Sequence, residues 1–222
     1  MENMGINTMV DERFWKDKRV YLTGSTGFKG SWLSLWLSNM GAEVKGYALK
    51  PTTTPSLFEL ANVSNKIEYE IGDIRNSKQL QASLTGFNPD ILIHMAAQPL
   101  VRLSYTKPVE TFETNVMGTV KVLDAARNCE SLKSIVNVTT DKCYKNKEWP
   151  WGYRENEAMG GLDPYSSSKG CAELVSSAYY HSFLHEKGVS LVTARAGNVI
   201  GGGDWAEGRL IPDILNAFQK KQ

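Results

Sequence analysis

Residues 23–30 read TGSTGFKG and place three glycines, Gly24, Gly27 and Gly30, at GxxGxxG spacing. The apolar stretch 19–23 comes before them and an apolar pattern at helical spacing follows, so the glycines fall at a strand-to-helix turn. Glycine permits a tight turn and lets a pyrophosphate approach the backbone N–H groups at the helix N-terminus, where the helix dipole favours an anion. The turn therefore predicts a dinucleotide site on the first strand of the fold.

Outward from this turn, short apolar strands alternate with helical patterns. Strands are predicted at 19–23, 43–49, 67–71, 90–97, 134–140 and 189–194, and helices at 31–40, 76–84, 108–128 and 163–187. Near-continuous apolar strands separated by helices favour a parallel sheet covered on both faces. The expected fold class is α/β, a doubly wound parallel sheet of the Rossmann type.

Three segments are predicted along the chain. Residues 1–13 are expected to form a flexible N-terminal arm, residues 14–198 a dinucleotide-binding domain with the catalytic residues, and residues 199–222 the beginning of a smaller C-terminal substrate domain. The last segment reads as a helix without a C-cap or a following strand. We therefore expect the rest of the substrate domain to lie outside this chain.

Composition narrows the class of protein. The chain has 222 residues and a net charge of +1, which gives no support for a nucleic-acid partner, and no apolar run approaches the ~18 residues of a membrane span. The start, MENMGINTMV, lacks the features of an export signal. Cys129, Cys143 and Cys171 share no metal-ligand spacing, and His181 and His185 lie four apart without a third ligand. A cytoplasmic protein with reduced thiols and no metal is expected.

A second motif, DPYSSSK at 163–169, opens a helix with proline in the first turn. Tyr165 and Lys169 are four residues apart and therefore share one face of that helix. A tyrosine base near neutrality needs a pKa about 3 units below its usual value. The charge of Lys169 and the helix N-terminus are expected to provide this shift. Thr140, at the end of the fifth strand, offers a hydroxyl to the substrate oxygen from which the tyrosine would remove a proton.

Taken in order, these features resemble the extended short-chain dehydrogenase/reductases over essentially the whole chain after the arm. The resemblance also rests on HMAAQ at 94–98 and on Asn115 in NVMGT. It implies NAD as the cofactor, with Asn115 in the active-site hydrogen-bond network and Ala97 beside the nicotinamide. By residue type alone, Asn115 on a long helix is equally well explained as structural. The implied cofactor-binding residues are Gly24, Thr26, Gly27, Phe28, Lys29, Gly30, Asp73, Ile74, Ala96, Ala97, Gln98, Asn115, Tyr165 and Lys169.

The choice between NAD and NADP is not settled by spacing. An acid at the end of the second strand usually holds the ribose of NAD, but the residues here are Ala48-Leu49-Lys50-Pro51. Lys50 either favours a 2′-phosphate or is simply exposed. Asp73, which ends the third strand, is a candidate for the adenine edge or, alternatively, the N-cap of the next helix.

Asp141 and Lys142 distinguish branches within the family. An acid beside a base after a buried strand is either ordinary loop charge or the acid and base of a reaction. The pair resembles the sugar-nucleotide 4,6-dehydratases, whereas epimerase-like members carry small residues here. Further similarity to the narrower group that acts on CDP-glucose lies in GFKGSWLSLWL at 27–37, HMAAQPLVRLSY at 94–105, NKEWPWGYRENE at 146–157 and ARAGNVIGGGDW at 194–205.

This resemblance implies a hydro-lyase that converts CDP-glucose to CDP-4-keto-6-deoxyglucose, in deoxysugar biosynthesis for a surface polysaccharide such as lipopolysaccharide O-antigen. Tyr165 would remove the proton of the 4-hydroxyl while hydride moves from C4 to the nicotinamide. Asp141, with a pKa raised by burial, is the candidate acid for the leaving C6 hydroxyl. Lys142, with a pKa depressed by desolvation or a neighbouring cation, is the candidate base for the C5 proton. Hydride then returns to C6.

Substrate contacts are predicted at Arg102, Asn198 and Arg209. By resemblance, Arg195 and Asn198 lie on the nucleotide-sugar side, with Asn198 favoured, and an ion pair is the alternative for Arg195. Arg209 would meet a phosphate as a planar donor. The aromatic run 149–153, WPWGY, either walls the substrate pocket or packs as a loop.

Other functions stay open at this point. A 4-epimerase would use Tyr165 and Lys169 without elimination, and a dinucleotide-binding sensor would need no base at all. A chain lacking its substrate domain would bind NAD without turnover. Which nucleotide the protein recognises also stays open, since the residues that contact the base are expected outside this chain. A homodimer through the helices at 108–128 and 163–187 is the expected assembly.

Overall fold

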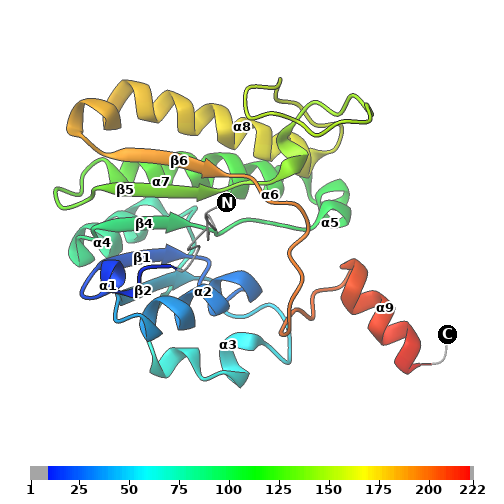
Figure 1. Cartoon of the computed structure of the whole chain (residues 1–222), viewed down its shortest axis with the longest axis horizontal. Helices are drawn as coiled ribbons and strands as arrows, with labels where there is room; N and C mark the ends of the chain where they lie inside the picture. The colour runs from blue at the N-terminus through cyan, green and yellow to red at the C-terminus, as the bar shows by residue number, and fades with distance from the viewer. Residues whose placement is uncertain (1–9, 221–222) are drawn as a thin grey trace, which may run out of the picture.

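The computed structural model describes residues 10–220 and contains a six-stranded, all-parallel sheet in the order β3-β2-β1-β4-β5-β6 (Figure 1). The winding direction reverses between β1 and β4. The predicted doubly wound α/β fold is confirmed. The strands are β1 (Arg19–Thr23), β2 (Glu43–Ala48), β3 (Glu68–Ile71), β4 (Ile91–His94), β5 (Ser134–Val138) and β6 (Ser190–Ala194).

Helices connect the strands and follow β6. They are α1 (Glu12–Trp15), α2 (Phe28–Asn39), α3 (Leu57–Leu60), α4 (Ser77–Phe87), α5 (Val101–Thr106), α6 (Pro108–Phe112), α7 (Gly118–Ala126), α8 (Pro164–Tyr179) and α9 (Leu210–Gln219). Shorter turns are η1 (Val63–Asn65), η2 (Glu113–Met117), η3 (Asp141–Cys143), η4 (Tyr180–Leu184) and η5 (His185–Lys187). Of these, η2 and η4 are π turns, so each of the two long predicted helices is interrupted.

Two apolar clusters hold the layers together, one on each face of the sheet. On one face, alternate strand residues such as Leu92 and Ile135 pack with α4, α7 and α8. On the other, Leu22 and Ile93 pack with Leu37 of α2 and with α3. The four strands β1, β2, β4 and β5 contribute to both clusters because successive side chains of a strand point to opposite faces. The sheet is therefore fixed between helices at its centre.

The second face is not covered at the β6 edge, which corrects the expectation of a sheet covered on both faces. Val136 of β5 and Val192 of β6 are in register and point to this face. Val136 is only half-buried, and Val192 is 54% exposed. Helix α9 lies away from the sheet (Figure 1), and none of its described side chains is buried. No described helix packs there, so this edge stays open.

The predicted N-terminal arm falls mostly on residues 1–9, which lie outside the described part of the chain. Helix α1 begins at Glu12 with Asp11 as its N-cap, and Trp15 packs partly buried against the α2 side of the core. Across residues 10–220, the structure contains no helix long and apolar enough to cross a bilayer.

Candidate active site at the carboxyl edge of the sheet

The glycine-rich turn joins β1 to α2 by close backbone packing. Gly24 has a φ of +77°, and a Cβ at this position would stand 2.8 Å from the backbone nitrogen of Ala96. A Cβ at Gly30 would stand 2.0 Å from the carbonyl oxygen of Gly24. Gly27 is the N-cap of α2, and no described side chain caps that end. The first N–H groups of α2 therefore have no partner from a described side chain, an arrangement that suits an anion.

His94 links this turn to the helices behind it. The Thr119 hydroxyl donates to the Asn115 carbonyl oxygen at 2.7 Å, so it must accept from Nε2–H of His94, 3.2 Å away. The His94 Nδ1 then accepts from the Thr23 hydroxyl at 2.7 Å, whose oxygen also accepts from Ala96 N–H at 3.1 Å. Burial, with a smaller contribution from the charge of Lys169, lowers the pKa of His94 to about 3. A neutral imidazole with one fixed tautomer thus ties β1, the loop after β4 and α7 together.

Asn115 lies on η2 and fastens the loop after β4 to α8. Its Oδ1 accepts from the backbone N–H of Gln98 at 2.8 Å, and its Nδ2 donates to the Gln98 carbonyl at 3.1 Å and to Ser168 Oγ at 2.9 Å. Both amide hydrogens are used in these contacts. The Gln98 side chain donates to the Leu100 carbonyl and the Thr111 hydroxyl. Both side chains are therefore committed to holding the loop in place.

Helix α8 begins at a capped end and carries Tyr165 and Lys169 on one buried face. Asp163 accepts from the backbone N–H of Ser166 at 3.0 Å. The Lys169 ammonium donates to the Val138 carbonyl at 3.1 Å. Burial, and to a smaller extent the charge of Lys29, lowers the pKa of Lys169 to about 8.

The pKa of Tyr165 is raised by burial, against the expectation of a lowered value. The hydroxyl of Thr140 and the charge of Arg209 act in the opposite direction but do not overcome burial. Lys169 is not among the main causes of the shift, and its ammonium is bonded to the Val138 carbonyl. The spacing of the two residues was predicted correctly, whereas the electrostatic result was not.

Asp141 and Lys142 form η3 directly after β5, with Thr140 as its N-cap. The Thr140 hydroxyl donates to Asp141 Oδ1 at 3.1 Å, and the backbone N–H of Asp141 donates to the Ala196 carbonyl at 3.1 Å. Both side chains are exposed, so the expected burial of Asp141 and desolvation of Lys142 are wrong for this structure. Within residues 10–220, nothing covers the outer side of the turn.

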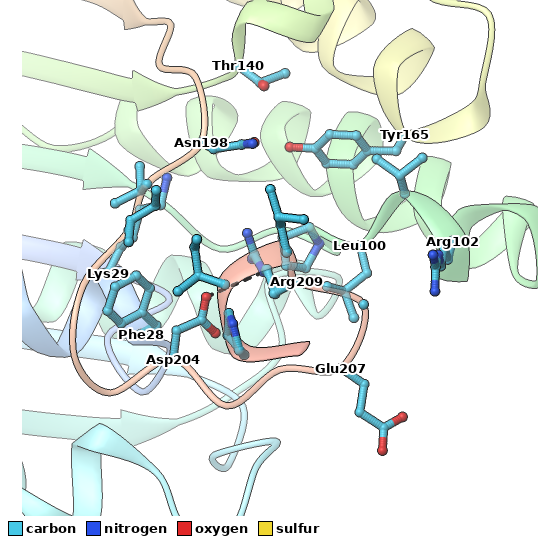
Figure 2. A pocket seen from close by; sticks show the side chains of 18 of the residues that line it. Phe28, Lys29, Leu100, Arg102, Thr140, Tyr165, Asn198, Asp204, Glu207 and Arg209 are labelled. Atoms are coloured by element: carbon cyan, nitrogen blue, oxygen red, sulfur yellow. Dashed lines mark ion pairs between the residues drawn. The ribbon is translucent and has the colours of Figure 1, made fainter. Parts of the chain in front are cut away.

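A cavity of about 860 Å³ lies between the glycine turn, the end of β5, helix α5 and the segment 196–215. In Figure 2 the side chains of Thr140, Asn198 and Tyr165 converge at one end, and Arg209 enters from the start of α9. Of the predicted site residues, those that line it are Phe28, Lys29, Arg102, Thr140, Lys142, Tyr165, Asn198 and Arg209. The cavity thus brings predicted cofactor, catalytic and substrate residues together.

Arg209 lies in this cavity beside one acid, Asp204. Its Nε lies 3.6 Å from Asp204 Oδ2, beyond hydrogen-bond distance (dashed in Figure 2), and that buried nitrogen has no hydrogen-bond partner in the described chain. Burial, and to a smaller extent the charge of Arg209, lowers the pKa of Lys29. Two cations therefore face the same space without full compensation, which suits an anionic ligand.

Several predicted site residues lie elsewhere or are used by the fold. The Asp73 carboxylate is paired with Arg75, with Oδ2 and Nη2 2.7 Å apart, and this hydrogen bonding lowers its pKa. The alternative N-cap role for Asp73 is wrong, because Asn76 caps α4. Ile74 is buried in the core against Gly118. The Thr26 hydroxyl donates to the Leu49 carbonyl at 2.7 Å.

Arg195 does not line the cavity. Its guanidinium makes a two-point contact with the buried Glu173 carboxylate, so the ion-pair alternative is the correct one. In the aromatic run, the Trp149 ring lies 5.1 Å from that of Trp151 and 5.3 Å from that of Tyr153. These aromatic rings pack on each other rather than walling the cavity, as the packed-loop alternative held.

One contact of the site was not predicted from the sequence. The segment 196–209 crosses α2, where the Trp32 Nε1 donates to the Gly202 carbonyl at 2.8 Å. A Cβ at Gly201 would stand 3.2 Å from the Phe28 ring, so this glycine permits the crossing. The glycine run GNVIGGGD at 197–204 was the available signal. For metals, no group of three ligating side chains occurs among the residues that are described, and His181 and His185 are exposed.

Comparison with known proteins places these features in a family. A family profile described as GDP-mannose 4,6 dehydratase matches residues 22–216. The CDP-glucose 4,6-dehydratase of Salmonella typhimurium is 60% identical over 96% of this chain and 61% of that protein. The CDP-paratose 2-epimerase of Salmonella typhi is 29% identical over 85% and 59%. The chain thus spans about three fifths of these relatives.

Solved structures share the fold. A UDP-glucose 4-epimerase from Thermus thermophilus, in complex with NAD, superimposes with a TM-score of 0.75 at 28% identity, over 86% of this chain and 59% of that one. A dTDP-glucose 4,6-dehydratase from Streptomyces venezuelae, a double mutant with NAD bound, gives a TM-score of 0.79 at 24% identity, over 91% and 62%.

Proposed function

This chain belongs to the GDP-mannose 4,6-dehydratase family, and on that premise we propose that it serves the NAD-dependent dehydration of CDP-glucose to CDP-4-keto-6-deoxyglucose. The observation that carries the proposal is the shared cavity, in which Tyr165 and Lys142 face the same space as the glycine turn. The 60% identity with the Salmonella typhimurium CDP-glucose 4,6-dehydratase supports the choice of nucleotide.

The residues at the glycine turn fit a dinucleotide. Gly24 and Gly30 leave no room for a Cβ, and the uncapped N-terminus of α2 offers free N–H groups. These groups would bind the pyrophosphate, with Lys29 beside it and Ala96 and Ala97 at the next strand end. Bound NAD would supply the acceptor for hydride from C4 and return that hydride at C6. NAD is preferred to NADP because related structures contain NAD.

Tyr165 would remove the proton from the sugar 4-hydroxyl. Its pKa is raised by burial, so the phenolate needs positive charge close by. Arg209 already acts in that direction, and the Thr140 hydroxyl would share the same substrate oxygen. Lys169 lies buried on α8, one helical turn after Tyr165. It would hold the tyrosine base in position and add positive charge when protonated.

Asp141 and Lys142 would carry out the elimination. The 4-ketone acidifies the C5 proton, which a base removes as the C6 hydroxyl leaves as water with a proton from an acid. Asp141 would be the acid and Lys142 the base, and Lys142 lines the cavity. Both are exposed, so their acid and base roles would depend on groups that cover the turn when substrate binds.

Arg102, Asn198 and Arg209 would hold the nucleotide sugar. All three line the cavity, and the guanidinium of Arg209 would meet a phosphate as a planar donor. The expected setting is the cytoplasm, consistent with three free cysteines, in deoxysugar biosynthesis for a surface polysaccharide. A homodimer through α6–α7 and α8 is the expected assembly.

The test is incubation of the purified protein with NAD and CDP-glucose, followed by mass spectrometry of the sugar nucleotide. UDP-, dTDP- and GDP-glucose run in parallel. Loss of one water from CDP-glucose alone is expected. Conversion to CDP-galactose, which has the mass of CDP-glucose and is separated from it by chromatography, would identify a 4-epimerase instead. Binding of NAD in calorimetry with no change in any sugar nucleotide would argue for a dinucleotide-binding protein without turnover.

A further inference from the structure

We propose that Arg195 and Tyr144 form a positioning contact that fixes the Asp141–Lys142 turn relative to α8. The inference rests on the proposed function, because it assigns this contact to the elimination step and not to the oxidation at C4. Neither residue lines the cavity, so the effect would act through the turn.

The anchor of the contact is a buried carboxylate on α8. Glu173 lies one helical turn after Lys169 and is only 6% exposed. It accepts from Arg195 Nε at 3.0 Å and Nη2 at 2.8 Å, from the Thr193 hydroxyl at 2.8 Å, and from the Thr139 hydroxyl. Burial alone would raise the pKa of Glu173, but these donors lower it, so the carboxylate stays ionised. Two parallel bonds to one carboxylate fix both the position and the plane of the guanidinium.

The free side of that guanidinium reaches the catalytic turn. Arg195 Nη1 donates to the Tyr144 hydroxyl at 2.8 Å and to the Glu155 carbonyl at 2.8 Å. The guanidinium carbon also lies 4.9 Å from the centre of the Tyr144 ring. Tyr144 immediately follows η3, and its backbone N–H donates to the Asp141 carbonyl at 3.3 Å. One side chain therefore joins the helix of the tyrosine base to the end of the turn that carries the acid and base.

The turn needs such an anchor. The Asp141 carboxylate accepts only from neighbouring Thr140 among the described residues, and both Asp141 and Lys142 are exposed. Backbone hydrogen bonds from Asp141 to Ala196 and from Gly160 to Cys143 hold the two ends. Elimination requires acid and base to meet the sugar at C6 and C5 while Tyr165 stays at O4, so a displaced turn slows that step first.

Tyr144→Phe tests the contact while keeping the ring and the buried Glu173–Arg195 pair. In the protein with NAD and CDP-glucose, we expect the rate of water loss to fall about 10- to 100-fold. Reduced cofactor should accumulate, because C4 oxidation continues while elimination is slow. NAD affinity should stay within about twofold. Tyr153→Phe is the matched control, because it removes a hydroxyl from the same loop. That hydroxyl contacts Asn146 and Lys147 but not Arg195, so its loss should leave both steps unchanged.

Hydrogen–deuterium exchange on the chain without cofactor gives a readout independent of turnover. In Tyr144→Phe, the amides of residues 141–145 should exchange faster, while those at the centre of α8 stay protected. Arg195→Lys, which keeps the charge but loses the fork, should show the same pattern. An active wild type with an unaltered Tyr144→Phe, or equal slowing of oxidation and elimination, overturns this inference alone. Absence of water loss by the wild type overturns the proposed function, and the role in elimination with it.

Discussion

A Cβ atom on Gly30 would stand 2.0 Å from the carbonyl oxygen of Gly24, so the first turn of α2 packs directly on the glycine-rich turn. The obstructing atom is backbone and cannot move aside as a flexible side chain would. We expect Gly30→Ala to lower the free energy of unfolding by about 3 kcal/mol, because the added methyl overpacks the junction. Urea denaturation measures the change, and weaker NAD binding should accompany it in calorimetry.

Gly86 provides the matched control. It lies inside helix α4, and a Cβ there would meet nothing within 4 Å. Gly86→Ala should therefore raise the free energy of unfolding by about 0.5–1 kcal/mol, since alanine restricts the unfolded chain and fits the helix. Equal destabilisation by both substitutions would show that the Gly30 effect does not come from the contact with Gly24.

The buried Lys169 predicts a stability that rises at alkaline pH. Burial lowers the folded-state pKa of Lys169 to about 8 from its usual 10.5. Between these values the unfolded chain binds more protons, so the free energy of unfolding increases with pH in that window. Lys169→Met should be more stable than the wild type by about 2–3 kcal/mol at pH 7, and this advantage should shrink toward pH 10.5. Guanidinium unfolding across this range measures it, and a difference independent of pH would contradict the assignment.

His94 predicts a loss of stability at acid pH. Its folded-state pKa is about 3 against a usual 6.5, so the unfolded chain binds more protons between these values. Stability is therefore lost as pH falls through this window, by up to about 5 kcal/mol from His94 alone. His94→Asn should make the chain less stable at pH 7 but flatten the decline. Nitrogen NMR at pH 5 should find a neutral ring protonated at Nε2, and a charged ring there would contradict the network.

The strands were predictable because each carries a short apolar run bounded by turn residues. Arg19–Thr23 was predicted without error, and the other strands were displaced at their ends by at most a few residues. The glycine turn was equally predictable from the sequence, since its spacing follows from the geometry of a strand-to-helix junction. The π turns at η2 and η4 were not, because their residues have the periodicity of an ordinary helix.

The parts of the site that the sequence did not predict are those set by tertiary contacts. Spacing alone gave Tyr165 and Lys169 a shared face but could not show that the Lys169 ammonium bonds to Val138. Burial, which raises the pKa of Tyr165, depends on how α8 packs on the sheet. Likewise, the sequence could not show that Arg195 lies apart from the cavity residues, because its partner Glu173 is 22 positions away in the chain.

Tyr165→Phe tests the proposed base without disturbing the fold. The phenol is buried at the start of α8 and lines the cavity, and phenylalanine keeps its ring. We expect kcat for water loss to fall about 10²- to 10⁴-fold, the range for loss of a general base, with NAD affinity kept within a few-fold in calorimetry. Tyr105→Phe, on the exposed face of α5, should retain full activity. Near-normal turnover by Tyr165→Phe would exclude it as the base.

The face formed by α6 and α8 predicts how copies of this chain associate. The two helices pack side by side, yet Val109 of α6 is 69% exposed and Leu174 of α8 is 63% exposed. Apolar side chains on neighbouring helices gain free energy when a second copy covers them, and a two-fold axis would bring four helices together. Leu174→Lys should therefore convert a dimer to a monomer in analytical ultracentrifugation, because it buries an unpaired charge at the interface. Phe218→Lys on α9, also exposed but away from this face, should leave the dimer intact. A Leu174→Lys chain that still sediments as a dimer would place the interface elsewhere.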